Sequence, residues 1–369
     1  MAELLLTIFF ISVLLFFLGT GIWVAISMIG VSAIGMILFT TRPVGDAMAT
    51  TIWGTSSSWT LTALPLFVWM GEILFRTKLS ENLFKGLSPW MQNLPGGLIH
   101  VNVVGCALFA AISGSSAATV ATVGKMSIPE LRKRKYPEKI LLGSLAGSGT
   151  LGLLIPPSII LIIYGVTVQE SIAKLFIAGI IPGIMIALIF MFYVIIWSLI
   201  NKNKMPKAQE AYSFFEKIKG SKQLMPVILL ILGVIGSIYT GVATATEAAS
   251  LGVVGALILS YFQNSLNIKT FRDSLLGATK TSCMIAFILA GSTFLSLAMG
   301  FTGLPRNLAM WIQNMDLSPY ILIFVLMIFY IILGMFLDGI SAVVLTMAII
   351  EPMIRQAGFD MIWFGIFLV

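Results

Sequence analysis

Long apolar runs separated by short polar segments make up most of this 369-residue chain. A helix of roughly 20 mostly apolar residues is long enough to cross a bilayer. The polar segments between the runs are too short to form a soluble catalytic domain. The pattern therefore predicts an all-α polytopic membrane protein, with spans near residues 3–18, 21–40, 59–76, 140–165, 174–200, 223–241, 245–262 and 281–301.

Two further apolar stretches, 97–130 and 319–352, each carry a small polar group in the middle. The first reads AISGSSAATVATVG around Ser113–Ser116, and the second has Asp338–Ser341 at its centre. Each stretch is too short for two full spans once its polar centre is subtracted. We therefore expect two re-entrant hairpins, in which a helix enters the membrane, turns at the polar group and returns to the same side.

The predicted span 140–165 carries a second polar interruption, GSGTLGLLIPPSII at residues 147–160. Proline removes a backbone donor and clashes with the preceding helical turn, and glycine weakens a helix. We expect a broken helix whose ends face the first hairpin turn, although a simple proline kink is the alternative.

Basic residues gather in two polar segments, LRKRKYPEK at 131–139 and the longer segment 201–222. Short cytoplasmic loops carry an excess of Lys and Arg. Placing both segments in the cytoplasm puts the N-terminus outside. All but four of the 22 basic residues then face the cytoplasm, the exceptions being Arg42, Lys174, Arg306 and Arg355.

An internal repeat relates the two halves of the chain. The pattern T-x-L-x-x-N-L occurs in RTKLSENLF, 76–84, and again 225 residues later in FTGLPRNLA, 301–309. The same offset places the first hairpin turn on the second. The spans preceding the two copies run in opposite directions, so the repeats are inverted, a recurrent design of secondary transporters.

The repeat divides the chain at residue 222. The first repeat, 1–222, holds scaffold spans 3–40, an arm 43–57, the hairpin 97–130, the broken helix 140–165 and a connecting span 174–200 with its loop. The second repeat, 223–369, holds scaffold spans 223–262, an arm 266–280 and the hairpin 319–352. The offset places a second broken helix beyond residue 369, so we expect the sequence to be truncated at its C-terminus.

Composition and the absence of some motifs argue against a nucleic-acid-binding protein and against several classes of enzyme. The chain is 10% charged with a mean hydropathy of +1.02, and its net charge of +7 lies in short loops rather than on a nucleic-acid-binding face. Cys106 and Cys283 lie in apolar segments and suggest neither a disulfide framework nor a metal site. The sequence lacks a G-x-x-x-x-G-K-[ST] motif, and its single histidine excludes H-E-x-x-H. We predict that the chain is not an enzyme and needs no cofactor beyond a coupling ion.

Turns at membrane depth leave backbone groups that lipid cannot satisfy, so such turns occur only against protein or a water-filled cavity. Their carbonyl and hydroxyl oxygens suit a hard cation, and the helix N-termini that follow suit an anion. The alternative is that these small residues only allow close helix packing. The polar turns at Ser113–Ser116 and Asp338–Ser341 are therefore the candidate site for an ion and an anionic substrate.

Four motifs together, SGSSAATVATVG, GTLGLLIPPSI, T-x-L-x-x-N-L and TATEAAS, resemble the large membrane subunit of the tripartite ATP-independent periplasmic (TRAP) transporters. The resemblance covers essentially the whole chain. It implies an elevator-type secondary transporter of the bacterial inner membrane, driven by an ion gradient, usually sodium. It also implies two partners, a small four-helix membrane subunit and a periplasmic substrate-binding protein that delivers a carboxylate such as a dicarboxylate or sialic acid.

Carried over by motif, the resemblance implies that Ser113, Gly114, Ser115, Ser116, Gly149, Thr150 and Pro156 frame the first ion and substrate surface, and that Asp338, Gly339 and Ser341 frame the second. It also leads us to expect sodium near Ser115, Ser116, Gly339 and Ser341. The resulting hypothesis is an ion-coupled importer of an organic anion. Two alternatives stay open, a related ion-coupled symporter or exchanger that works without a binding protein, and a channel. The sequence alone does not separate the oxygens that contact sodium from those that contact the solute.

Overall fold

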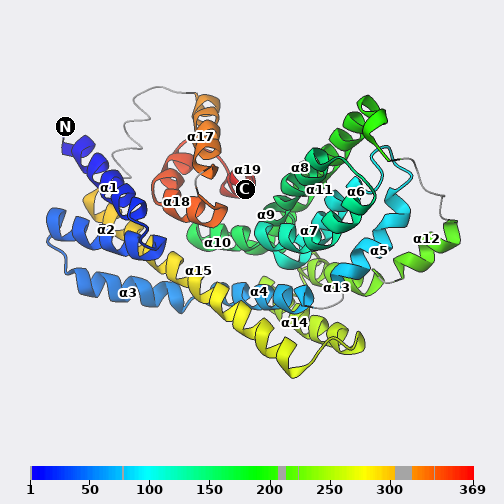
Figure 1. The fold of residues 1–369 in the computed structure, drawn as a ribbon. Helices are drawn as coiled ribbons and strands as arrows, with labels where there is room; N and C mark the ends of the chain where they lie inside the picture. The colour runs from blue at the N-terminus through cyan, green and yellow to red at the C-terminus, as the bar shows by residue number, and fades with distance from the viewer. Residues whose placement is uncertain (1, 77–78, 207–212, 223, 304–317, 336) are drawn as a thin grey trace. The chain divides into compact units, whose positions relative to one another are not determined.

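The computed structural model describes residues 2–76, 79–206, 213–222, 224–303, 318–335 and 337–369. These residues form helices and short connections, with no strand among them (Figure 1). Their contacts define two compact units. Unit 1 is Met1–Leu61, Ile162–Ser171 and Thr281–Val369, and unit 2 is Thr62–Leu161 and Ile172–Lys280.

Unit 2 contains the first hairpin and most of the broken helix. Its helices are α4 (Ala63–Phe75), α5 (Leu79–Met91), α6 (Ile99–Ser113), α7 (Ser116–Lys133), α8 (Glu138–Gly149), α9 (Leu151–Leu154), the start of α10 (Ile159–Thr167), α11 (Ile172–Ile200), η2 (Lys202–Lys204), α12 (Phe214–Ser221), α13 (Met225–Tyr239), α14 (Ala245–Phe262) and the first part of α15 (Ile268–Thr302). Helix α4 packs along α14, where Gly252 faces the Met70 side chain. Small residues of this kind let membrane helices approach closely.

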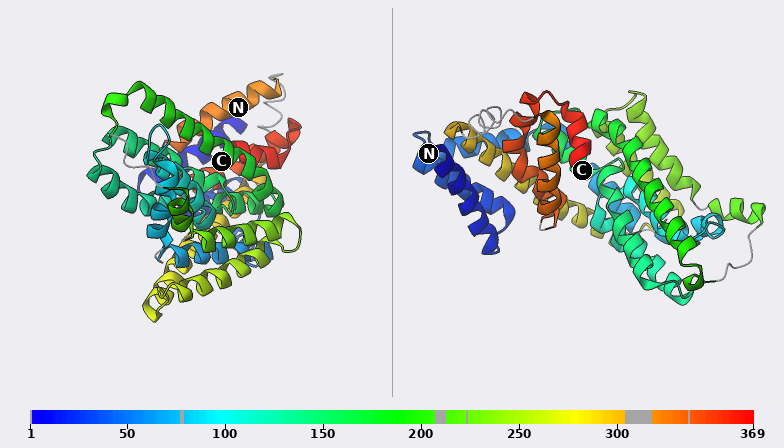
Figure 2. Two further views of the ribbon diagram at one scale, coloured as in Figure 1. Left: turned by 90° about the vertical axis from the view of Figure 1, so that its right-hand side faces the viewer. Right: turned by 90° about the horizontal axis from the view of Figure 1, so that it is seen from above.

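Unit 1 contains the second hairpin. Its helices are α1 (Ala2–Gly19), α2 (Val24–Phe39), α3 (Val44–Ser56), the rest of α15, α17 (Pro319–Gly334), α18 (Gly339–Gln356) and α19 (Met361–Leu368), with the short helix η1 (Trp59–Thr62) at its boundary (Figure 2). Met36 of α2 and Phe294 and Ala298 of α15 form a buried cluster in this unit. The Ser292 hydroxyl of α15 donates a hydrogen bond of 2.6 Å to the Val344 carbonyl of α18.

The C-terminal half of α10 belongs to unit 1 and is fixed there by polar contacts. The buried Tyr164 hydroxyl donates to the Met361 carbonyl at 2.6 Å. Arg355 of α18 donates to the Val168 carbonyl at 2.9 Å and forms an ion pair with Glu351. Arg355 is one of the four basic residues that depart from the predicted cytoplasmic bias, and this contact gives it a structural role at the end of α10.

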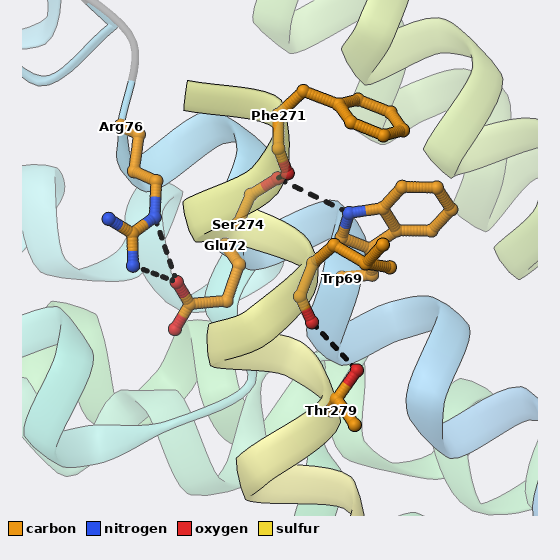
Figure 3. A network of polar contacts seen from close by, with 7 residues as sticks. Trp69, Glu72, Arg76, Phe271, Ser274 and Thr279 are labelled. Atoms are coloured by element: carbon orange, nitrogen blue, oxygen red, sulfur yellow. Dashed lines mark hydrogen bonds and ion pairs between the residues drawn. The ribbon is translucent and has the colours of Figure 1, made fainter. Parts of the chain in front are cut away.

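Figure 3 shows how the start of α15 is held against α4 in unit 2. The Trp69 indole N–H donates to the Ser274 hydroxyl at 3.3 Å, and its ring meets Phe271 edge-on at 5.8 Å between centroids. Glu72 forms an ion pair with Arg76 at 3.1 Å. A Cβ at Gly277 would lie 2.7 Å from a Glu72 carboxylate oxygen, so only glycine fits there without movement. This part of α15 is the predicted arm 266–280, and it packs on a neighbouring helix.

Several predicted elements coincide with observed helices. Helix α14 begins at residue 245 and ends at 262, and α11 and α13 follow their predicted spans to within two residues. The predicted arm 43–57 is α3. One boundary differs, because α15 is continuous through residue 280. Residues 276–286 contain one glycine and no proline, which is too little to end a helix.

Several helices are long and apolar enough to cross a membrane. Within the described ranges these are α11, α14, α15 and α18, or up to six spans if each of two bent pairs is counted as one. One bent pair is α3 with η1 and α4, and the other is α8 and α9 with α10. The repeat motif T-x-L-x-x-N-L lies partly outside the described residues, since Thr77 and residues 304–317 are not among them.

Candidate functional site

The first hairpin turn lies between α6 and α7 in unit 2. Helix α6 ends at Ser113, and Gly114 adopts the left-handed conformation with φ of 58°. Glycine is favoured there because it has no Cβ to clash. Ser115 is extended and caps α7, its hydroxyl accepting from the Ala118 N–H at 3.4 Å. Helices α6 and α7 pack against each other, so residues 97–130 form a helix–turn–helix hairpin.

Hydrogen bonds between residues of this turn and the start of α7 hold the turn together. The Ser113 and Thr119 hydroxyls lie 2.9 Å apart, and the Thr119 hydroxyl also lies 2.7 Å from the Ser115 carbonyl. Thr119 is fully buried. It was not among the predicted site residues, although its spacing of four from Ser115 would place it on the same face of α7 and could have pointed to it.

The broken helix packs on the turn. The Gly114 carbonyl accepts from the Ile159 N–H at 3.3 Å, and a Cβ at Gly114 would lie 2.7 Å from the Pro157 carbonyl oxygen. On the other side, a Cβ at Gly152 would lie 2.9 Å from the Ser115 carbonyl. The helix is interrupted between Leu154 and Ile159 with a bend of 40°, which confirms that the proline pair breaks it. Turn and break therefore form one packed body.

The other predicted residues of the broken helix have distinct positions. Gly149 faces the Val120 side chain of α7, with no room for a Cβ between them. Thr150 is exposed, and its hydroxyl donates to the Gly147 carbonyl at 2.7 Å. Pro156 is buried at the break. Gly149 and Pro156 thus pack the body, whereas the Thr150 hydroxyl makes a bond within its own helix.

A buried amide joins the hairpin to the first part of the broken helix. The Asn102 side chain of α6 is fully buried, and its N–H groups donate to the Leu141 carbonyl at 3.2 Å and the Ser144 hydroxyl at 3.0 Å. Sequence reasoning missed Asn102, although a single amide within the apolar run IHVNVVGCALFAA is a detectable signal.

The second hairpin turn lies between α17 and α18 in unit 1. Asp338 caps α18, because its Oδ2 accepts from the N–H groups of Ile340 and Ser341 at 3.1 and 3.2 Å. Gly339 is the first residue of α18, and the Ser341 side chain is buried. Farther from the turn, the Tyr330 and Thr346 hydroxyls lie 2.7 Å apart and join the two helices.

The two turns therefore offer different chemistry. Ser113, Gly114, Ser115 and Ser116 provide only hydroxyl and backbone groups, whereas the second turn adds the Asp338 carboxylate. Hard cations such as sodium prefer oxygen ligands, and both turns supply them. No group of three or more His, Cys, Asp or Glu side chains suited to a transition metal occurs in the part of the chain that the structure describes. Each turn belongs to a different unit and is described within that unit.

This helical chain, with its span-length apolar helices, a helical hairpin and a helix broken at a proline pair, has the make-up of a multi-pass membrane transporter. Residues 11–369 match the sequence model of the family described as "Tripartite ATP-independent periplasmic transporter, DctM component". The chain belongs to this family, and it is therefore the large permease subunit of a TRAP transporter rather than an enzyme.

Three relatives illustrate the range of the family. The chain is 31% identical to the C4-dicarboxylate TRAP transporter large permease protein DctM of Pseudomonas aeruginosa, over 91% of this chain and 78% of the relative. It is 30% identical to the sialic acid TRAP transporter large permease protein SiaM of Vibrio cholerae, over 95% and 82%. It is 31% identical to the 2,3-diketo-L-gulonate TRAP transporter large permease protein YiaN of Escherichia coli, over 87% and 75%.

Proposed function

We propose that this subunit imports an organic anion carrying a carboxylate across the bacterial inner membrane, driven by a sodium gradient. The support is chemical. The relatives named for C4-dicarboxylates, sialic acid and 2,3-diketo-L-gulonate all name carboxylate solutes. The turns at Ser113–Ser116 and Asp338–Ser341 offer oxygens for the cation, and helix N-termini with N–H groups suited to an anion.

The observation that carries the proposal is the packed body formed by the first hairpin turn and the broken helix. Gly114 and Gly152 bring two interrupted helices into backbone contact, which makes the body suited to move as one piece. We propose that both hairpins are re-entrant and travel with their broken helices against a scaffold that includes 3–40 and 223–262, as in an elevator. Sodium bound at Ser115, Ser116, Gly339 and Ser341 orders the turns before the solute binds.

Two partners complete the proposed assembly. The word tripartite in the family description supports a complex of this permease with a small membrane subunit and a periplasmic binding protein that delivers the solute. We place the N-terminus outside, because the basic segments 131–139 and 201–222 then face the cytoplasm.

The test replaces one hydroxyl at each turn. Ser116→Ala combined with Ser341→Ala, in the assembled transporter in proteoliposomes, should abolish solute uptake driven by a sodium gradient. A lost polar contact of about 1–3 kcal/mol at each site corresponds to a loss of roughly 5- to 150-fold in affinity per site. The matched control is Ser250→Ala on α14, an exposed serine whose hydroxyl bonds only within its own helix.

Unchanged uptake in the double variant would refute the assignment of the turns. Two further readouts address the other classes of transport. Uptake without the binding protein would indicate a transporter that works alone, and a linear, non-saturating conductance would indicate a channel.

A further inference from the structure

Helix α12 carries an apolar face that points away from the protein. Phe215 and Ile218 are 76% and 49% exposed, and Lys222, just after the helix, is exposed as well. Residues three and four positions apart share one face of an α-helix, so these three side chains lie together. An eight-residue helix of this kind is too short to cross a bilayer.

The opposite face of α12 is fixed to α5. The Trp90 indole N–H of α5 donates to the Ser221 hydroxyl at 2.6 Å, and the Lys217 ammonium lies 5.7 Å from the centre of the Trp90 ring. Gly220 faces Pro89 of α5. Lys217, Gly220 and Ser221 therefore define the packed side of α12, which leaves Phe215 and Ile218 on the outer side.

The position of α12 in the chain brings it close to the membrane. The apolar helix α13 begins at Met225, only a few residues after Ser221. On α13, Met225, Leu229 and Leu232 are exposed and share one face, as lipid-facing residues do. The sequence predicts a span at 223–241, and a helix that ends this close to its start lies at the level where that span enters the bilayer.

The positive charge around α12 favours an anionic lipid surface as the partner of its exposed apolar face. The segment 201–222 carries six lysines and two glutamates, and the neighbouring segment 131–139 is also basic. Amphipathic helices with aromatic and aliphatic residues on one side and lysines nearby lie in the headgroup region of bilayers. Basic residues beside a membrane add attraction to anionic headgroups.

We propose that α12 is an interfacial helix that inserts Phe215 and Ile218 among the headgroups of anionic phospholipids and so anchors the α5–α12 pair to the membrane surface. This inference does not depend on the solute or on the coupling ion. It requires only that α11 and α13 cross the bilayer.

The test measures lipid contact directly. An environment-sensitive fluorophore is attached at Ile218→Cys, with Cys283→Ala removing the exposed cysteine and the buried Cys106 retained. The assembled permease is placed in nanodiscs of phosphatidylcholine, with or without phosphatidylglycerol, that contain lipids carrying a quencher near the headgroup. The matched control is Asn203→Cys, an exposed residue of the same segment outside α12.

The label at position 218 should be quenched severalfold more than the label at 203, with a further increase when phosphatidylglycerol is present. Lys222→Gln should lower the ratio of inserted to free helix about fivefold in the anionic nanodiscs, the effect of roughly one basic residue near such a surface. Lys204→Gln, which lies before α12, should have a smaller effect.

Equal quenching at 218 and 203, or quenching at 218 that does not respond to phosphatidylglycerol, overturns the proposal. A label at position 218 that is shielded from water but not quenched by the lipids also overturns the proposal. That result indicates that a protein partner covers this face. Transport activity is not the readout, so failure here is distinguishable from failure of the proposed transport function.

Discussion

The two hairpin turns are built from similar residues but are held in different ways. At the first turn, Thr119 closes on Ser113, and Ile159 of another helix donates to the Gly114 carbonyl. At the second turn, Asp338 accepts two N–H groups of its own helix, and Met335 is 76% exposed. The first turn therefore depends on tertiary packing, whereas the second is stabilised by a local cap.

This difference shows how one repeated sequence feature can serve two mechanical roles. A turn locked by packing moves with the segment that packs on it, because separating them would expose backbone groups that lipid cannot satisfy. A turn held by an N-cap needs fewer contacts with other helices to keep its shape. Losing those contacts therefore costs it less free energy. Substitutions at matched positions can test this contrast.

The largest effect is expected from Gly114→Ala. A left-handed backbone costs an alanine about 1–2 kcal/mol, and forcing a Cβ to within 2.7 Å of the Pro157 carbonyl oxygen adds about 1–3 kcal/mol. Denaturant titration of the solubilised permease should show this loss, together with a loss of uptake. Gly334→Ala at the end of α17 is the control, because a Cβ there meets nothing within 4 Å. Equal stability of the two variants would contradict the packed first turn.

A smaller loss is expected from Thr119→Val, which keeps the shape of the side chain but removes its hydroxyl. Leaving the buried Ser113 and Ser115 groups with fewer partners costs about 1–3 kcal/mol in the free energy of unfolding. Uptake should need more sodium, and Thr119→Ser should restore it. The counterpart Thr346→Val breaks the bond to Tyr330 away from the second turn and should lower stability without changing the sodium requirement. If Thr119→Val leaves the sodium requirement unchanged, the first turn does not take part in ion binding.

The smallest effect is expected at the cap of the second hairpin. Asp338→Ala should lower the free energy of unfolding by about 0.5–2 kcal/mol, the usual value of a helix N-cap. Asp360→Ala, which removes the cap of α19, is the matched control and should cost a similar amount. Asp338→Asn keeps a capping oxygen and should leave stability unchanged, so any fall in its uptake measures the role of the carboxylate charge. A large loss of stability in Asp338→Asn would show that the turn is held by more than its cap.

Much of the candidate site could be predicted from residues that act locally. Gly114 and Ser115 end one helix and cap the next through their own backbone preferences, and the pair Pro156 and Pro157 breaks a helix by removing donors. These effects depend on a few neighbouring residues, so the pattern of the sequence located the first turn, the break and the polar residues of the second turn.

Other features could not be predicted, because they depend on segments distant in the sequence. The Ile159 N–H of α10 donates to the Gly114 carbonyl of the first turn, 45 positions earlier in the chain. Asn102 meets Leu141 and Ser144 about forty positions away. The joining of the predicted arm and span into α15 was missed because weak helix formers near residue 280 are tolerated when the helix has partners to pack against.

The sequence by itself determined that this chain is a helical membrane protein and where its helices turn, because hydropathy, glycine, proline and caps act over one or two helical turns. Its motifs added the resemblance to a transporter subunit. The tertiary structure decided that the broken helix packs on the first turn and that Asp338 caps the helix after the second. It also decided which face of α12 is packed on α5 and which points outward. The two packing outcomes depend on contacts between distant segments, and no local propensity specifies them.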